Sequence, residues 1–291
     1  MVTIQFREKK DAILFFHQLQ EFDHPNINDI QVHIIYEPEV LVKIDFRKSI
    51  KSLISSILIP VLIQYIIKIV EVNWMKEMIR NMFYFTDEEE QRQIMSIARS
   101  IIDGERQDVP AVIGVNKELT RNQMIESSLK DFLTSSVSFS FESFLQFRLK
   151  EYRYRLLKYI EAAIDEYKLE QEYQNFIENL RTYLYNKEPL MDTIHLVYDG
   201  TFCFFDKNKN ELCSEQLTHI IDEQLLKIED IDVDSEVLAP LISIAPRKVF
   251  IYTDHLDHGF IQTIQNVFLE RVAILAKQAF LHPKRTISKS N

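Results

Sequence analysis

Glycine is scarce in this chain, which has four glycines among its 291 residues, at positions 104, 114, 200 and 259. A phosphate-binding P-loop or a dinucleotide-binding turn needs several clustered glycines, and no two of these four lie within one motif length. Collagen-like, low-complexity and large all-β architectures are excluded for the same reason, because they use glycine heavily. The chain also has no Gly-x-Ser-x-Gly sequence, which excludes the serine hydrolases that are built on that turn.

Cysteine is rarer still. Cys203 and Cys213 are too few for a disulfide framework, and no signal-peptide pattern is present, so we expect a cytoplasmic protein with reduced thiols. If residues 206–210 form the turn of a hairpin, the two cysteines fall opposite each other across its strands. A cross-strand bridge is then geometrically conceivable.

The rest of the composition is that of a globular protein, with 46% hydrophobic and 27% charged residues. The formal net charge is −10. Most of it comes from residues 211–236, which hold nine acidic side chains against one lysine, Lys227. This acidic segment is where we would look for a basic partner.

One long apolar run, Leu53–Val70, passes the length and hydropathy test for a membrane span. On a helical wheel its polar residues form one narrow stripe, because they recur every four residues: Ser52, Ser56, Pro60, Gln64 and Lys68. A helix of this kind is either a membrane span or the central helix of a soluble core. No second segment of this kind would shield Gln64 and Lys68 from lipid, so we expect a core helix and no membrane insertion.

The first 47 residues read as β-α-β-β. Val2–Phe6 alternates between apolar and polar residues, residues 11–22 have apolar side chains at helical spacing, and Glu37-Pro38-Glu39 joins two further strand patterns. After the apolar run, Thr86-Asp87-Glu88-Glu89 predicts a capping box that opens a helix, which Gly104 closes.

The middle of the chain contains no glycine between positions 114 and 200 and no proline between 110 and 189, so it is free to be helical. Thr120–Gln123 predicts the start of one helix, which ends in the serine-rich residues 134–140. A long helix then runs from Phe141 towards Tyr185. Because this length exceeds the usual range, we expect a break near residues 168–174.

The last third returns to strands. Asp199-Gly200 is the strongest hairpin signal in the chain, and a second turn at residues 207–210 leads to a short third strand. Helical patterns follow at residues 214–228 and 235–244. A buried strand is predicted at residues 248–252 and a closing helix at residues 260–280.

These patterns predict an α+β fold: an N-terminal βαββ unit packed on an apolar helix, a long helical middle, and a C-terminal antiparallel β-meander with helices. We expect an N-terminal α/β unit at residues 1–104, a helical region at 116–188 and a C-terminal α+β unit at 190–283. Residues 284–291 are predicted to be a flexible tail.

The densest cluster of metal-capable side chains is Asp254-His255-Leu256-Asp257-His258, at a predicted strand-to-helix junction. His255, Asp257 and His258 have part of the ligand spacing of metallo-β-lactamase-like hydrolases, but Thr253 stands where that motif has another histidine. Asp257 is also well placed as a helix N-cap, and Asp254 favours a helix N-terminus. We predict no cofactor, and a divalent metal on these three residues remains an alternative.

Basic and aromatic residues alternate between residues 147 and 159, which suggests nucleic-acid binding. On the wheel, Tyr152 and Tyr159 lie on the apolar seam and are predicted to be core residues. Lys150, Tyr154 and Lys158 share one outward patch. These three residues are therefore the candidate binding site for a nucleic acid or another polyanion.

Three stretches of the chain resemble the YtxC-like family of endospore-forming bacteria. They are Gln64–Arg99, the hairpin HLVYDGTFCFFDKNKNEL at residues 195–212, and DSEVLAPLISIAPRKVFIYTDHLDHGFIQTIQNVFLERV at residues 234–272. The resemblance implies a role in sporulation. It transfers no catalytic residue, cofactor or activity to any position of this chain.

Because no complete catalytic constellation is present, we expect a cytoplasmic, sporulation-associated protein that acts by interaction or regulation and has a protein partner. Two alternatives remain. One is a metal-dependent hydrolase that uses the Asp254–His258 cluster, and the other is a nucleic-acid- or polyanion-binding protein.

Overall fold

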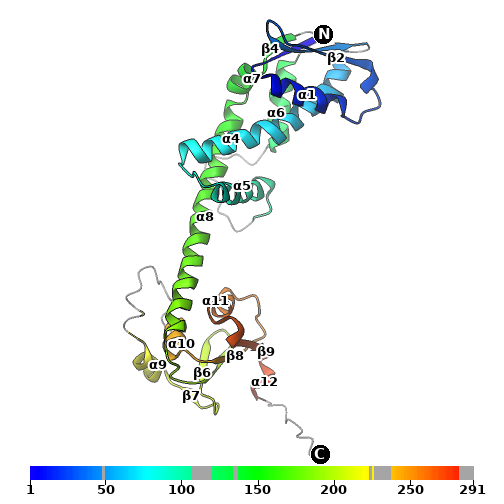
Figure 1. The fold of residues 1–291 in the computed structure, drawn as a ribbon. Helices are drawn as coiled ribbons and strands as arrows, with labels where there is room; N and C mark the ends of the chain where they lie inside the picture. Colours follow the sequence, from blue (N-terminus) through cyan, green and yellow to red (C-terminus); the bar gives the residue numbers. More distant parts are fainter. Residues whose placement is uncertain (48–49, 107–118, 134–136, 223–224, 226–236, 282–291) are drawn as a thin grey trace, which may run out of the picture. The chain divides into compact units, whose positions relative to one another are not determined.

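The computed structural model describes residues 1–47, 50–106, 119–133, 137–222, 225 and 237–281. The chain divides into two compact units, Met1–Lys168 and Leu169–Asn291. The fold is α+β, as predicted, with two small sheets and a larger helical content (Figure 1). The predicted tail and residues 226–236 of the acidic segment lie outside the described residues.

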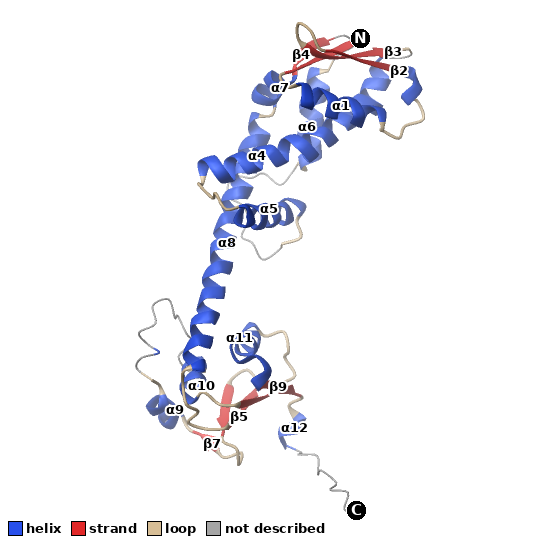
Figure 2. Cartoon of the chain, viewed as in Figure 1, coloured by secondary structure: helices blue, strands red, loops and turns tan. Residues whose placement is uncertain are grey.

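The first unit begins with the predicted βαββ arrangement. Strand β1 (Val2–Phe6) is followed by helix α1 (Lys9–Gln20) and by the hairpin of β2 (Ile30–Ile35) and β3 (Val40–Phe46). The sheet order is β2-β3-β1-β4, and β1 pairs with β3 antiparallel and with β4 (Val137–Ser140) parallel. The residues of β4 had been predicted only as the end of a helix. Figure 2 shows α1 on the same side of this sheet as helices α6 (Arg121–Phe132) and α7 (Phe141–Arg148).

The apolar run lies within one continuous helix, Ile50–Met82. Its α-helical parts are α2 (Ile50–Leu53), α3 (Ile59–Tyr65) and α4 (Glu71–Glu77), and each is followed by a π-helical turn. Among the described residues this is the one helix that is long and apolar enough to cross a membrane, and 56% of its most apolar stretch is buried inside the protein. Its buried residues pack with α1 and the sheet in one hydrophobic core, which includes Phe15, Leu58, Leu62 and Ile66.

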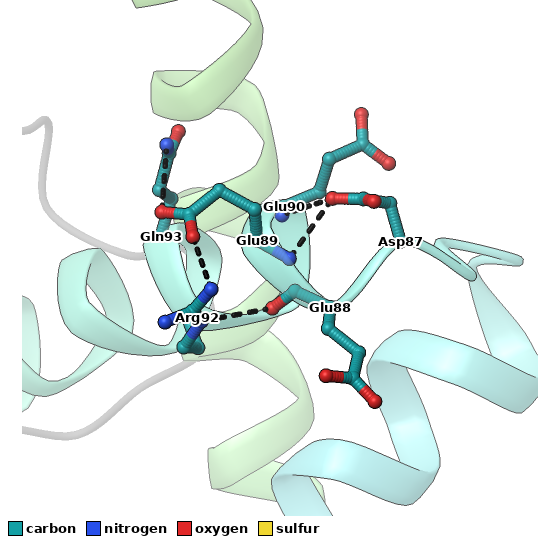
Figure 3. Close-up of polar contacts among 6 residues, drawn as sticks. All are labelled: Asp87, Glu88, Glu89, Glu90, Arg92 and Gln93. Atoms are coloured by element: carbon teal, nitrogen blue, oxygen red, sulfur yellow. Dashed lines mark hydrogen bonds and ion pairs between the residues drawn. The ribbon is translucent and has the colours of Figure 1, made fainter.

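Helix α5 (Glu88–Asp103) begins within the predicted capping motif, but its N-cap is the second residue of that motif and not Thr86. The cap residue is Asp87, whose Oδ1 accepts hydrogen bonds from the backbone N–H groups of Glu89 (2.9 Å) and Glu90 (3.0 Å) (Figure 3). Gly104 closes the helix with φ 76°, a left-handed conformation that glycine adopts without steric cost. The local sequence therefore sets both ends of this helix.

Helix α8 (Lys150–Tyr185) runs for 36 residues without interruption, so the break predicted at residues 168–174 is wrong. The interruption occurs earlier, at Leu149 between α7 and α8. Buried side chains recur in two parts of the helix, among them Leu156 and Ile160 in the first unit and Ile177 and Leu180 in the second, whereas residues 168–175 are all exposed.

The second unit contains a five-stranded sheet in the order β7-β6-β5-β8-β9. The predicted meander is present: β5 (Thr193–Tyr198), β6 (Phe202–Phe205) and β7 (Glu211–Leu212) pair antiparallel. Strand β8 (Lys248–Tyr252) lies parallel to β5 and to β9 (Val272–Leu275). Helices complete the unit: α9 (Ser214–Ile220), α10 (Leu238–Ile244), α11 (Gly259–Phe268) and α12 (Gln278–Leu281).

The predicted closing helix at residues 260–280 is only partly correct. It ends at Phe268, and residues 272–275 form strand β9. The apolar spacing is ambiguous here, because Val267 and Phe268 are buried in the core through the helix while Val272 and Ile274 pack against the same core from a strand.

Candidate functional site

The Asp254–His258 cluster lies at the edge of the second sheet where its parallel strands end. Strands β5, β8 and β9 are parallel, so their carboxyl ends meet at one edge, the usual place for a ligand site in such a sheet. β8 ends at Tyr252, the loop 253–258 follows, and α11 begins at Gly259. The strand-to-helix junction is thus confirmed.

Two backbone contacts fix this loop. Thr253 is buried, and its N–H donates to the carbonyl oxygen of Leu275, 3.0 Å away on β9. Its side-chain Oγ1 accepts a hydrogen bond from the N–H of His255 at 3.0 Å. The first turn of the loop is therefore held by a buried hydroxyl group.

Charged side chains connect the ends of the three strands. Asp254 Oδ1 accepts a hydrogen bond from the backbone N–H of Lys277 (3.3 Å), and the Lys277 ammonium forms an ion pair with Asp199. The hydrogen bond and the charge of Lys277 hold the pKa of the exposed Asp199 carboxyl below its usual range. Asp254 thus contacts the backbone of Lys277, the residue that directly precedes α12 (Gln278–Leu281), and not the N-terminus of α11.

The two histidines pack around one aromatic ring. The His258 ring lies 4.7 Å from the ring of Tyr198 between centroids, and the His255 ring approaches the same tyrosine edge-on at 6.0 Å. Asp257 is exposed, and the residue at the N-cap of α11 is His258, so the predicted capping role of Asp257 is wrong. The cap has no side-chain hydrogen bond.

This geometry does not assemble the predicted ligand set. Within the described residues, no group of three or more His, Cys, Asp or Glu side chains is placed to hold a metal ion. His255 and His258 contact an aromatic ring, and Asp257 lies in an exposed part of the loop. The metal-dependent hydrolase receives no support from these positions.

The candidate polyanion site lies in the first unit, on the first three turns of α8. Lys150 and Tyr154 are exposed, and the Lys158 ammonium lies 5.5 Å from the centre of the Tyr154 ring. The same ammonium is 2.6 Å from Glu161 Oε2, so a neighbouring carboxylate partly neutralises it. Tyr152 and Tyr159 are buried, as predicted.

The other basic residues of this region point to different partners. Arg153 approaches Glu77 at 3.5 Å and lies over the Trp74 ring. Arg155 donates to the carbonyl oxygen of Leu119 at 2.6 Å. The cations therefore do not gather into one stripe that could follow a phosphate backbone.

Sequence reasoning missed a polar cluster in the core of the first unit. The Glu71 side chain on α4 is buried, with 2% of the residue exposed. The Tyr152 hydroxyl donates to Glu71 Oε2, and an Arg121 guanidinium nitrogen lies 3.5 Å from Oε1. Burial is the main cause that raises the pKa of Glu71. The only available signal was an acidic residue at the end of an apolar run.

Comparisons with known proteins place this chain in a family. The model of the YtxC-like family matches residues 56–273. A relative from Bacillus subtilis (strain 168), "Uncharacterized protein YtxC", is 38% identical over 281 residues, which cover 96% of each chain. No solved structure matches. The chain therefore belongs to the YtxC-like family.

Proposed function

We propose that this protein acts in sporulation by binding a protein partner, and that it does so through the exposed side chains at the junction of α7 and α8. We define the α7–α8 face as Phe147, Lys150, Tyr154 and Lys158. The observation that carries the proposal is the exposure of its two aromatic residues, because 72% of Phe147 and 55% of Tyr154 is accessible to solvent.

Exposed aromatic side chains on an ordered helix favour a protein contact. A solvent-exposed phenylalanine keeps apolar surface in contact with water, which is unfavourable. Aromatic side chains also supply a large share of the binding energy at protein–protein interfaces. Tyr154 also carries Lys158 against its ring, which holds both side chains in place. Tyr154 thus has less conformational freedom to lose on binding than an unrestrained side chain.

The charges of this face favour an acidic protein segment over a nucleic acid. Among the described residues Lys150 has no ion-pair partner, whereas Lys158 is already paired with Glu161. One available cation, one helical turn before Tyr154, suits a peptide that carries an apolar side chain and a carboxylate. A polyanion needs several aligned cations, and the net charge of −10 opposes its approach.

The sporulation context comes from the family resemblance. Membership of the YtxC-like family and the relative in Bacillus subtilis support it. The cytoplasmic location is part of the same proposal. It is supported by the burial of the helix Ile50–Met82, whose apolar residues already have partners in the core of the first unit.

The test replaces exposed aromatic side chains inside and outside the α7–α8 face, in the organism that encodes the protein, and compares the number of spores formed. A Phe147→Ala, Tyr154→Ala chain should lower the number of heat-resistant spores by about tenfold or more, because losing two aromatic anchors costs about 2 kcal/mol or more of binding. Tyr185→Ala is the matched control, since it removes another exposed tyrosine of α8, and it should leave the count unchanged. Equal spore counts for all three chains would refute the proposed surface.

A photo-reactive amino acid at position 154 identifies what binds the face. We expect one discrete protein adduct during sporulation, and we expect Phe147→Ala to abolish it. Retention of single-stranded DNA by the purified chain, with an affinity that falls as salt rises, would replace this proposal by polyanion binding. Unchanged spore counts after deletion of the gene would remove the sporulation role, and recovery of the chain with membranes would remove the cytoplasmic location.

A further inference from the structure

We propose that Cys203 and Cys213 form an oxidation-dependent disulfide site across strands β6 and β7. Strands β6 and β7 pair Phe204 with Leu212 and Phe205 with Glu211. Extending this register by one residue places Cys203 opposite Cys213, the residue that follows β7 and precedes helix α9. Both cysteines are free thiols in the structure.

The hydrogen-bond pattern fixes the type of this pair. At the hairpin turn the N–H of Asp206 donates to the carbonyl oxygen of Asn210 at 2.9 Å, so this pair is hydrogen-bonded. Antiparallel ladders alternate between hydrogen-bonded and non-hydrogen-bonded pairs, so the Cys203–Cys213 pair, three steps away, is non-hydrogen-bonded. Such pairs bring the two Cα atoms to about 4.5 Å, within the range that a disulfide spans.

The neighbouring strand supports the same assignment. The N–H of Asp199 donates to the carbonyl oxygen of Thr201 at 3.2 Å, and the ladder pairs Val197 with Cys203. By the same alternation, the backbone of Cys203 is bonded to β5 and not to β7. The N–H of Cys213 is correspondingly directed elsewhere, to Gln216 Oε1 at 3.0 Å.

The Cys203 thiol is on the face of the sheet that points away from the core. Phe204 is buried in the core, so its neighbour Cys203 lies on the opposite face, and Cys203 remains half-buried there. Cys213 is exposed at the end of β7. The exposed sulfur is the one that a small-molecule disulfide reaches first.

The reaction proceeds in two exchanges that need only a small-molecule disulfide as the oxidant. The Cys213 thiol loses its proton, and the thiolate attacks one sulfur of that disulfide, forming a mixed disulfide and releasing one small thiolate. The Cys203 thiolate then attacks the Cys213 sulfur, forms the Cys203–Cys213 bond and releases the second small thiolate. The two cysteines are oxidised, and the small-molecule disulfide is reduced to two thiols.

The experiment treats the purified full chain with oxidised glutathione as the probe and measures its intact mass and free thiols. We expect the chain to lose two hydrogen atoms and both thiols, with no bound glutathione, because the paired thiols act at an effective concentration on the order of mM or more. Cys203→Ser and Cys213→Ser should each retain one glutathione as a mixed disulfide. Far-ultraviolet circular dichroism of the reduced chains checks that both variants are folded.

Three results would overturn the site. They are glutathione bound to the unsubstituted chain at equilibrium, two unreacted thiols in that chain, or a disulfide-linked dimer on a non-reducing gel. Conversion of the unsubstituted chain alone to the bridged form supports the site. This outcome is independent of the α7–α8 face, which lies in the other unit.

Discussion

Replacing Tyr152 by phenylalanine removes one atom from the buried cluster around Glu71. The Tyr152 hydroxyl donates to Glu71 Oε2, and both residues are 2% exposed. The phenylalanine ring keeps the packing of α8 against α4, so the substitution isolates the hydrogen bond. The carboxylate then retains the Arg121 guanidinium, at 3.5 Å, as its partner.

The expected loss is large because water cannot replace the missing donor. A hydrogen bond to a charged group contributes about 1.5–3 kcal/mol, and a buried acceptor left without it bears its desolvation cost. We expect Tyr152→Phe to lower the free energy of unfolding of the first unit by about 2 kcal/mol. For a unit of this size the corresponding fall in Tm is roughly 4–8 °C.

The fluorescence of the single tryptophan reports on unfolding of the first unit alone. Trp74 is packed against the hydrophobic core of that unit, so its fluorescence during urea unfolding reports on the region around Glu71. Tyr167→Phe is the matched control, because Tyr167 is also on α8 and its hydroxyl donates to Glu90, a half-buried carboxylate, at 3.2 Å. This control should lose less than about 1 kcal/mol. Equal losses in the two variants would show that burial of the acceptor does not set the cost.

Three further predictions use the same fluorescence assay. Burial raises the pKa of Glu71 in the folded state, so the unfolded state releases its proton first as the pH rises. The wild-type chain should therefore lose stability relative to Glu71→Gln as the pH rises above the ordinary carboxyl range, and a constant difference would contradict this. Asp87→Ala removes the N-cap of α5 and should cost about 1 kcal/mol, whereas Thr86→Ala should cost little. Tyr84 is exposed at φ 62°, so Tyr84→Gly should add roughly 0.5–1 kcal/mol and Tyr84→Ala should add nothing.

Local sequence signals predicted the elements that depend on short-range contacts. The left-handed end at Gly104 and the hairpin at Gly200, with φ 83°, each need a specific residue at one position, and the start of α5 was predicted to within one or two residues, although its cap is Asp87 and not Thr86. The apolar run was correctly assigned as a helix because its polar stripe has helical spacing. Such features are set within a few residues, so the sequence alone could identify them.

Elements that depend on distant partners were missed. Strand β4 has four residues and is stabilised by pairing with β1, which lies more than 130 positions earlier in the chain. Strand β9 likewise forms because its backbone pairs with that of β8. At the candidate site, Lys277 contacts Asp199 and Asp254 because three strands end at the same edge of the sheet. The spacing of the two histidines, which resembles that of metal ligands, could not predict that both would pack against the ring of Tyr198.

The buried carboxylate links the missed cluster to the ambiguous apolar helix. Glu71 ends the apolar run, and its partners Tyr152 and Arg121 come from α8 and α6, which are distant in sequence. Glu71 is satisfied only when α4, α6 and α8 are packed together. Withdrawing the helix Ile50–Met82 into a bilayer would remove these donors from the carboxylate and expose the apolar surfaces that now cover the helix. The folded first unit therefore needs this helix in its core, and a substitution that weakens the cluster, such as Tyr152→Phe, should loosen the packing of α4 against α8.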